Sequence, residues 1–584
     1  MKQFFITILG VFAGLFLFLI VMPFLLIASL AGSAGAPAPT PSQSVLVVDL
    51  RLPMTDQPPV SPFGSLSGGI AVTDIVQKLE AAENDRHVRG VFVRAPEMGL
   101  APAHAEEIRQ ALIDFEASGK FVIAHAQGFF APTITNYVAV SAATELWLQG
   151  SSDFAATGLS AETLFLGGLF ERFGISPQFE QFYEFKNAAN VYTQTDYTEA
   201  HRTAETSLLT SIYNAALAAA ALDRNMPVET LKAALDRAPM SAPDAIAARL
   251  ADKTGMPEEA LDAALARAGG VDSATALDIA DYAPPAGSGD VIAVVAGEGP
   301  ILGGPDSTDP FGSETEMNGD AIAAAIREAT DDDSVKAIVL RVSSPGGSPL
   351  ASEQIWAAVE RAQSLEKPVV VSMGAYAASG GYYVAAGADR IIALPSTITG
   401  SIGVLGGKLA VDAGLNRYTG ANLSTVTVGG PFASAYDAGE AFTNSQREAF
   451  RASMQRIYDD FTGKVAEGRK MELARVQEVA RGRVWTGAQA RPLGLVDGIG
   501  GLREAIRVAK ELGGIDADAA VQIAWYPAQE DPLQAIADLF GTGTTLARAA
   551  AVMGLVAGDD RLVTLLRLAS RPEQVQALEP VRVR

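Results

Sequence analysis

The stretch that decides the fold is residues 366–407, EKPVVVSMGAYAASGGYYVAAGADRIIALPSTITGSIGVLGG. Its β-branched run at residues 369–371 predicts a buried strand. The tract YAASGG that follows, with its serine at position Ser379, leads into a helix of small residues predicted over 382–388. A serine between a strand end and a helix start is well placed as a nucleophile, because the positive end of the helix stabilises negative charge.

A second glycine-rich turn is expected to face the same spot. A strand predicted over residues 338–342 runs into SSPGGS at residues 343–348. The glycines there, Gly346 and Gly347, give the backbone freedom to point an amide N–H at a developing oxyanion, together with the amide of Gly380. Each motif alone is also typical of a helix N-cap or a plain strand-to-helix turn. The two motifs together favour catalysis.

The composition excludes several classes of function. With 584 residues and 48% hydrophobic content, the chain has room for two or more folded domains. Its net charge of −23 argues against nucleic acid as a partner, since phosphate binding needs a basic surface. The chain has no cysteine, and no two of its four histidines share ligand spacing on a helix. Neither a metal nor another cofactor is therefore expected.

The N-terminus predicts a membrane anchor. Residues 4–30 carry no charge and are long enough to span a bilayer. They exceed the core of a cleaved signal peptide, which is about 7–15 residues, so an anchor retained over residues 1–31 is expected. Lys2 precedes this segment, and the positive-inside rule then places the N-terminus in the cytoplasm and the body on the other side. Residues 32–44, rich in proline, alanine and serine, predict a linker.

The rest of the chain contains an internal repeat of two copies. Residues 88–94 match residues 335–341 at an offset of 247 (341 − 94), and the match continues on both sides. Both copies alternate apolar strands with helix-length segments, which predicts α/β domains with largely parallel sheets. The predicted parts are a first copy over 45–284, a linker over 285–289, a second copy over 290–527 and a C-terminal tail over 528–584.

The motifs SSPGGS, YAASGGYY and PSTITGSIGVLGG resemble the signal peptide peptidase A family of bacterial membrane serine proteases. These are relatives of Clp protease within the crotonase-like fold. The resemblance implies tandem crotonase-like domains that cleave leftover signal peptides and similar apolar peptides. It also implies a homo-oligomer, a tetramer, at the bacterial inner membrane with its catalytic body on the periplasmic side. ARGRVWTG, residues 480–487, also matches the family and is assigned a structural role.

A serine nucleophile needs a base at neutral pH, and the second copy contains no histidine. Lys186 follows the aromatic tract FYEF, which can supply the desolvation that a neutral lysine requires. In the long form of the family, the base is a lysine of the N-terminal copy in such a setting, and the serine comes from the C-terminal copy. Ser401, in TGSIG, matches the family serine that holds the lysine amine. The resemblance thus implies a dyad of Ser379 and Lys186 assembled across the two copies.

The residues leave other bases and other functions open. His125 at a strand end and Lys408 in the second copy are the other candidate bases, and Lys186 could be an ordinary surface lysine. The first copy carries Thr133, between a proline and a β-branched residue, where the second has Ser379, so its nucleophile is expected to be lost. An acyl-CoA enzyme of the same fold and an inactive membrane scaffold are the alternative functions.

Overall fold

The computed structural model describes residues 39–58, 69–285, 287–304 and 316–527, together with Gly10 and Gly14. None of the helices in these ranges is both long and apolar enough to cross a bilayer. Apart from the two glycines, the anchor predicted over residues 4–30 lies outside the described residues, and so does the tail over 528–584.

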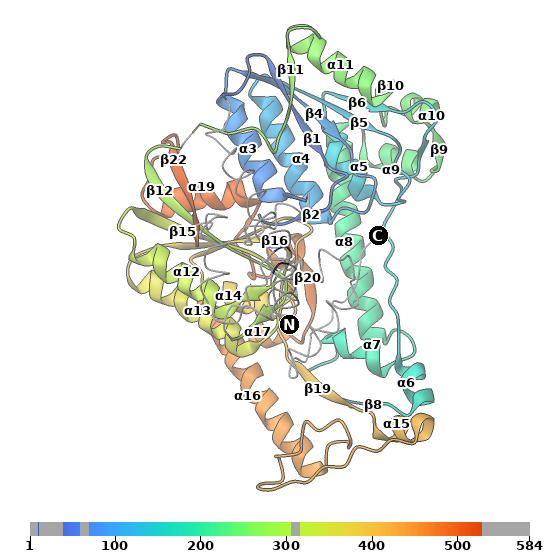
Figure 1. Ribbon diagram of the computed structural model, residues 1–584, viewed down its shortest axis with the longest axis vertical. Helices are drawn as coiled ribbons and strands as arrows, with labels where there is room; N and C mark the ends of the chain where they lie inside the picture. The colour runs from blue at the N-terminus through green and yellow to red at the C-terminus, as the bar shows by residue number, and fades with distance from the viewer. Residues whose placement is uncertain are drawn as a thin grey trace.

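Two sheets form the body, one from each copy, with the sheet of the first copy above that of the second in Figure 1. In spatial order the first sheet contains β10 (Lys253–Thr254), β6 (Glu145–Leu148), β5 (Phe121–Ala126), β4 (Val88–Arg94), β1 (Ser44–Asp49) and β11 (Thr275–Asp278). The second contains β20 (Val484–Thr486), β18 (Ile398–Gly400), β16 (Val369–Ala378), β15 (Val335–Ser344), β12 (Asp290–Glu298) and β22 (Val521–Tyr526), with β17 (Arg390–Ala393) beside β16 and β21 (Gly498–Ile499) beside β17.

The two sheets repeat one plan. Ser44 lies opposite Thr275 in the first, and Asp290 lies opposite Val521 in the second, so both partners move by the same 246 residues (290 − 44 and 521 − 275). Every pairing within the two sheets is parallel except that of β18 with β20. The predicted α/β class with largely parallel sheets is therefore confirmed.

Helices cover both faces of each sheet, which is why the central strands are apolar on both sides. In β1, Leu46 and Val48 belong to the core beneath α3 and α4, whereas Val45 packs toward α11. In β12, Val295 belongs to the core beneath α12 and α13, whereas Val294 packs toward α19. These helices are α3 (Val72–Asn84), α4 (Pro102–Ala117), α11 (Pro257–Ala268), α12 (Gly319–Asp331), α13 (Pro349–Ser364) and α19 (Leu502–Leu512).

The strand that leads to Ser379 is longer than the sequence predicts. β16 continues past residue 371 to Ala378, and helix α14 (Gly380–Ala385) begins at once, so the prediction of a helix over 382–388 is shifted. The extension forms because residues 376–378 pair with the short strand β18 after a register shift in the pairing with β15. Small residues without an apolar run thus become a strand through their partner.

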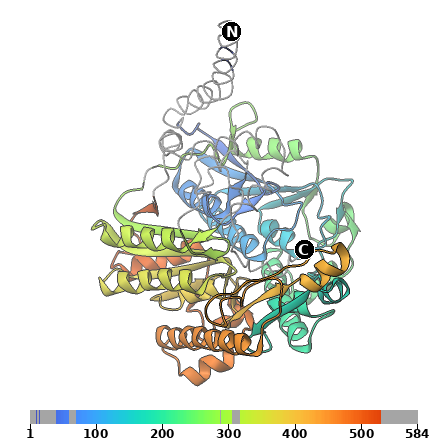
Figure 2. The same cartoon turned by 60° about the horizontal axis from the view of Figure 1, so that its bottom comes forward.

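A long segment of the first copy lies against the second. β8 (Ser176–Gln181) pairs antiparallel with β19 (Leu405–Ala410), and the two strands lie side by side in Figure 1. Figure 2 shows α15 (Asp412–Thr419, orange) beside the teal segment with α6 (Gly167–Phe173) and α7 (Asn190–Thr193). Two long helices, α8 (Glu199–Asp223) in the first copy and α16 (Asn444–Gly468) in the second, follow these segments.

A buried charged cluster joins the two copies. Arg341 on β15 is fully buried and donates to Asp56 at 2.7 and 2.8 Å and to Glu107 at 2.6 Å, and both carboxylates come from the first copy. The same guanidinium donates to Ser372 at 2.9 Å. His104 lies 3.3 Å from Asp56. A buried charge is tolerated only when it is paired and hydrogen-bonded, and these contacts meet that condition.

Candidate active site

Ser379 stands between β16 and α14 in a strained backbone conformation. Its φ of 53° and ψ of −115° lie outside the regions that residues with a side chain normally occupy. Its N–H donates to the carbonyl of Gly400 at 2.9 Å, and its side chain makes no cap hydrogen bond to α14. Ser379 thus occupies the N-cap position of α14 without capping the helix through its side chain, and its hydroxyl is available for other contacts.

The amine of Lys186 lies at hydrogen-bonding distance from that hydroxyl. Lys186 Nζ is 3.0 Å from Ser379 Oγ, 3.0 Å from Ser401 Oγ and 2.9 Å from the Ser401 carbonyl oxygen. The lysine is only 7% exposed, so it is not an ordinary surface lysine. Burial lowers the pKa of Lys186 to about 7, so a large fraction of the amine is neutral near pH 7.

The chain delivers Lys186 by way of the pairing between β8 and β19. Just after β8, the N–H of Phe182 donates to the carbonyl of Val404 at 3.0 Å, and Phe182 is buried in an apolar cluster that includes Tyr458. The backbone then turns at Tyr183, whose φ is 70°, and brings Lys186 to the second copy. Of the predicted aromatic flank, Phe182 is therefore buried in the apolar cluster, whereas Tyr183 is 42% exposed.

Ser401 occupies the turn that follows β18. Its φ is 49°, and its N–H donates to the carbonyl of Arg483 at 2.8 Å. Because the N–H is engaged on one side, both the hydroxyl and the carbonyl of Ser401 can accept from the lysine amine on the other. The structure therefore brings Ser379, Lys186 and Ser401 into one contact.

The three glycines named above lie together beside Ser379. A Cβ at Gly346, whose φ is +104°, would lie 2.6 Å from the nitrogen of Gly380, so a side chain there would displace that turn. The N–H of Gly346 itself donates to Ser344 Oγ at 3.1 Å. Within the described ranges, the N–H groups of Gly347 and Gly380 have no protein acceptor. The two amides left for a ligand oxygen are therefore those of Gly347 and Gly380.

The other candidate groups lie elsewhere. His125 Nε2 is 3.1 Å from the carbonyl of Gly255 in the first copy. Lys408 Nζ donates to the carbonyl of Asp437 at 2.8 Å. Thr133 accepts a hydrogen bond from the N–H of Thr135 and caps α5 (Ile134–Ser141), which is the structural role that Ser379 lacks. Among the described residues, no group of three or more acidic or histidine side chains could hold a metal ion.

The sequence did not point to the residues that cover Lys186. Gly482, in the ARGRVWTG segment assigned a structural role, packs its backbone on the lysine, and a Cβ there would lie 2.5 Å from Lys186 Cβ. The signal that could have found it is the difference between the copies, since the first copy has no Arg-Gly-Arg before the matching strand.

Comparison with known proteins finds several peptidases that are similar to this chain. The chain matches the model of Peptidase family S49 twice, over residues 114–270 and 361–516. It is 30% identical to "Serine protease SPPA, chloroplastic" of Arabidopsis thaliana over 82% of this chain and 71% of that protein. It is also 30% identical to "Protease 4" of Salmonella typhi over 77% of this chain and 74% of that protein. A third relative, "Putative signal peptide peptidase SppA" of Enterococcus faecium, is 32% identical over 34% of this chain and 57% of its own length.

Proposed function

Because the chain belongs to peptidase family S49, in the long form with two repeats, and is a serine protease, we propose that Ser379 is its nucleophile and Lys186 its general base. The observation that carries this proposal is the 3.0 Å separation of Lys186 Nζ from Ser379 Oγ at a buried amine. Family membership favours a peptidase over the acyl-CoA alternative, because both repeats match a peptidase model.

The proposed reaction is acyl transfer in two steps. Neutral Lys186 takes the proton of Ser379 as Oγ attacks the scissile carbonyl, and the resulting ammonium gives that proton to the leaving amine. Ser401 keeps the amine in line. The amides of Gly380 and Gly347 would donate to the oxyanion, with Gly346 shaping the turn. A water molecule, deprotonated by the same lysine, then hydrolyses the acyl-enzyme and restores Ser379.

The substrate class and the setting of the enzyme are part of the proposal. We propose leftover signal peptides and similar apolar peptides as substrates, which the name of the Enterococcus faecium relative supports. The uncharged residues 4–30 would hold the chain in the inner membrane with its body in the periplasm. The first copy, residues 45–284, would supply the base, and the second, residues 290–527, the nucleophile. A tetramer is proposed from the family resemblance alone.

The test of the proposed nucleophile is covalent labelling. A fluorophosphonate probe is expected to modify Ser379, as mapped by mass spectrometry of the digested protein. Because the pKa of Lys186 is about 7 and only the neutral amine is a base, the labelling rate should rise about tenfold between pH 6 and pH 8 and then level off. Thr133 is the internal control, since its hydroxyl is engaged in a helix cap and should remain unlabelled. The absence of an adduct at Ser379 would reject this residue as the nucleophile, and a flat pH profile would reject Lys186 as its base.

The proposed anchor has its own test. The full chain, expressed in bacteria, is expected to stay in the membrane fraction after alkaline carbonate extraction, because an apolar span of this length inserts stably. A variant that lacks residues 1–31 should move to the soluble fraction while keeping peptidase activity. Release of the full chain by carbonate would contradict the anchor and leave the dyad untouched.

A further inference from the structure

Residues 481–483 of the second copy contact the loop of the first copy that carries Lys186. Arg481 donates from Nε and Nη2 to the two carboxylate oxygens of Glu184, each at 2.9 Å. The same guanidinium lies 5.0 Å from the ring centroid of Tyr183. A paired two-point contact of this kind fixes the direction of both side chains as well as their distance.

The next two residues, Gly482 and Arg483, also contact this loop. Gly482, with φ +75°, packs directly on the backbone of Lys186 and leaves no space for a side chain. The guanidinium of Arg483 lies 5.1 Å from the ring of Phe185 and 4.2 Å from that of Trp485. Three consecutive residues of the second copy therefore contact four consecutive residues of the first, 183–186.

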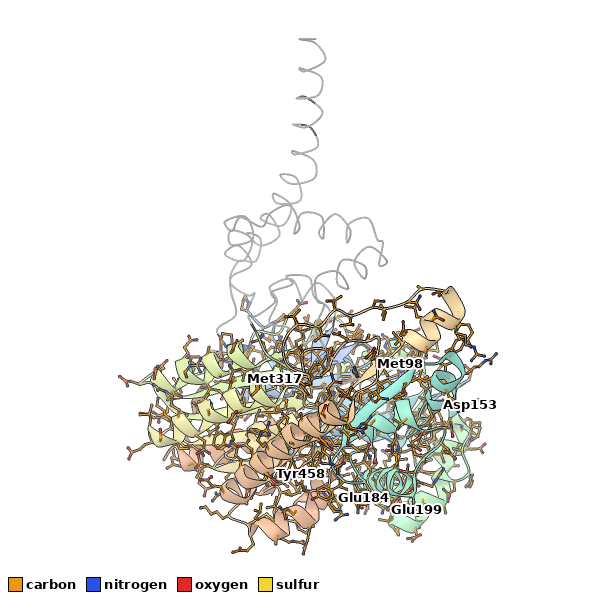
Figure 3. The ribbon with its side chains drawn as sticks, turned by 90° about the horizontal axis from the view of Figure 1, so that it is seen from below. Met98, Asp153, Glu184, Glu199, Met317 and Tyr458 are labelled. Carbon is orange, nitrogen blue, oxygen red and sulfur yellow. The ribbon has the colours of Figure 1, made fainter. Side chains whose placement is uncertain are left out.

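The same segment also holds the turn that carries Ser401. The carbonyl of Arg483 accepts from the N–H of Ser401 at 2.8 Å, and the N–H of Gly482 donates to the carbonyl of Ile402 at 2.9 Å. Residues 481–483 thus touch the lysine loop on one side and its hydrogen-bond acceptor on the other. Figure 3 shows Glu184 and Tyr458 in the same region, where the orange α16 meets the teal segment of the first copy.

The first copy contains an equivalent segment that can be compared with residues 481–483. Each copy has a short antiparallel strand followed by a side-chain-capped helix: β20 and α18 (Gly487–Ala490) in the second, β9 (Met240–Ser241) and α10 (Ala242–Ala247) in the first. Aligning the caps Thr486 and Ser241 places residues 236–238, Asp-Arg-Ala, on residues 481–483. The local fold therefore forms without Arg-Gly-Arg, and that sequence has another purpose.

We propose that Arg481 and Glu184 are positioning residues, which hold the lysine loop of the first copy so that Lys186 reaches Ser379. The inference rests on the dyad proposed above. The side chains of Arg481 and Glu184 are 45% and 43% exposed, so their pair adds little to stability, and its value lies in geometry. A displacement of about 1 Å at a reacting group can cost about 100-fold in rate.

The loosened loop would also change the protonation of the base. The charged side chains on the two contacting segments are Glu184, Arg481 and Arg483, and burial is the cause of the lowered pKa of Lys186. Water admitted by a loosened loop would raise that pKa toward its usual range. Activity lost at pH 7 would then return in part at pH 9, which a loss of folding would not produce.

The test uses the full chain with Arg481→Gln, Glu184→Gln and the charge swap Arg481→Glu with Glu184→Arg. Each single variant is expected to lower kcat about 10–100-fold at pH 7 with a small change in KM, and to move the midpoint of the pH profile upward. The charge swap is expected to recover most of the activity. Arg507→Gln is the matched control, because it removes a similar paired contact with Glu504, at 2.8 and 2.8 Å, far from the site.

The two single variants separate positioning from direct electrostatics. Removing a positive charge would raise the pKa of the lysine and removing a negative one would lower it, whereas loosening the loop raises it in both. Midpoints that move in opposite directions would therefore overturn the inference, and so would wild-type kinetics in both variants. If those variants behave as wild type while Lys186→Met is inactive, only the positioning role fails. If Lys186→Met is active, the dyad fails first.

Discussion

Replacement of Lys186 by methionine is expected to lower kcat for an apolar fluorogenic peptide by about 10³–10⁴-fold at pH 7. Methionine keeps the length of the side chain but cannot accept a proton. The other candidate bases are not expected to replace Lys186 as the base. Lys408 Nζ is hydrogen-bonded to the backbone carbonyl of Asp437, and His125 Nε2 to that of Gly255. The measurement is single-turnover hydrolysis, with Ser379→Ala setting the activity that remains without a nucleophile.

Two further variants sharpen this result. Lys186→Arg keeps a positive charge that is not lost at neutral pH, so it should be as inactive as Lys186→Met. Lys408→Met is the matched control, since Lys408 is a second buried lysine, 9% exposed, whose loss should leave more than half of the activity. Activity of Lys186→Met within tenfold of wild type, in a protein with an unchanged Tm, would rule out Lys186 as the base.

Replacement of Arg341 by methionine is expected to destabilise the protein by about 3–5 kcal/mol, because it leaves two buried carboxylates without their cation. Burial alone would raise the pKa of Asp56, but the charge and hydrogen bonds of Arg341 hold that pKa well below its usual range. The carboxylate therefore stabilises the fold above the pKa of the unfolded chain and loses that contribution only in strong acid. The measurement is the shift in the urea midpoint at pH 7.

The repeat supplies the control for this variant. Arg94 occupies the position of Arg341 in the first copy, is only partly buried and donates to Gln127 at 3.0 Å. Arg94→Met should cost less than about 1 kcal/mol. Equal midpoints for the two variants would mean that the cluster of Arg341, Asp56 and Glu107 does not join the copies. The triple replacement of all three by apolar residues should recover stability, since an uncharged core needs no counter-charge.

The sequence predicted the sheets and the three site residues for different reasons. Apolar runs such as residues 369–371 define strands wherever they occur, so the α/β class could be predicted locally. Ser379, Lys186 and Ser401 were identified by their motifs, and the structure then gave their distances. The extension of β16 could not be predicted, because it depends on pairing with β18, whose three residues are too few to show a strand periodicity.

The charged cluster of Arg341, Asp56 and Glu107 could not be predicted from the sequence for a related reason. Arg341 lies in an apolar strand, and its partners Asp56 and Glu107 are 285 and 234 residues away. No local pattern links residues at that separation. The choice between the amides of Gly346 and Gly347 was equally hidden, since it depends on whether Ser344 Oγ faces the first of them.

The sequence separation of 193 between Lys186 and Ser379 sets an order of events during biosynthesis. Lys186 leaves the ribosome well before Ser379, and the pairing of β8 with β19 cannot form until residue 410 has also emerged. A nascent chain therefore contains Lys186 before Ser379 has been made. After Ser379 has been made, the two side chains remain apart until the two copies dock. With the proposed dyad divided in this way, the protease would become active only after the two copies have docked, which would delay proteolysis until much of its own chain is folded.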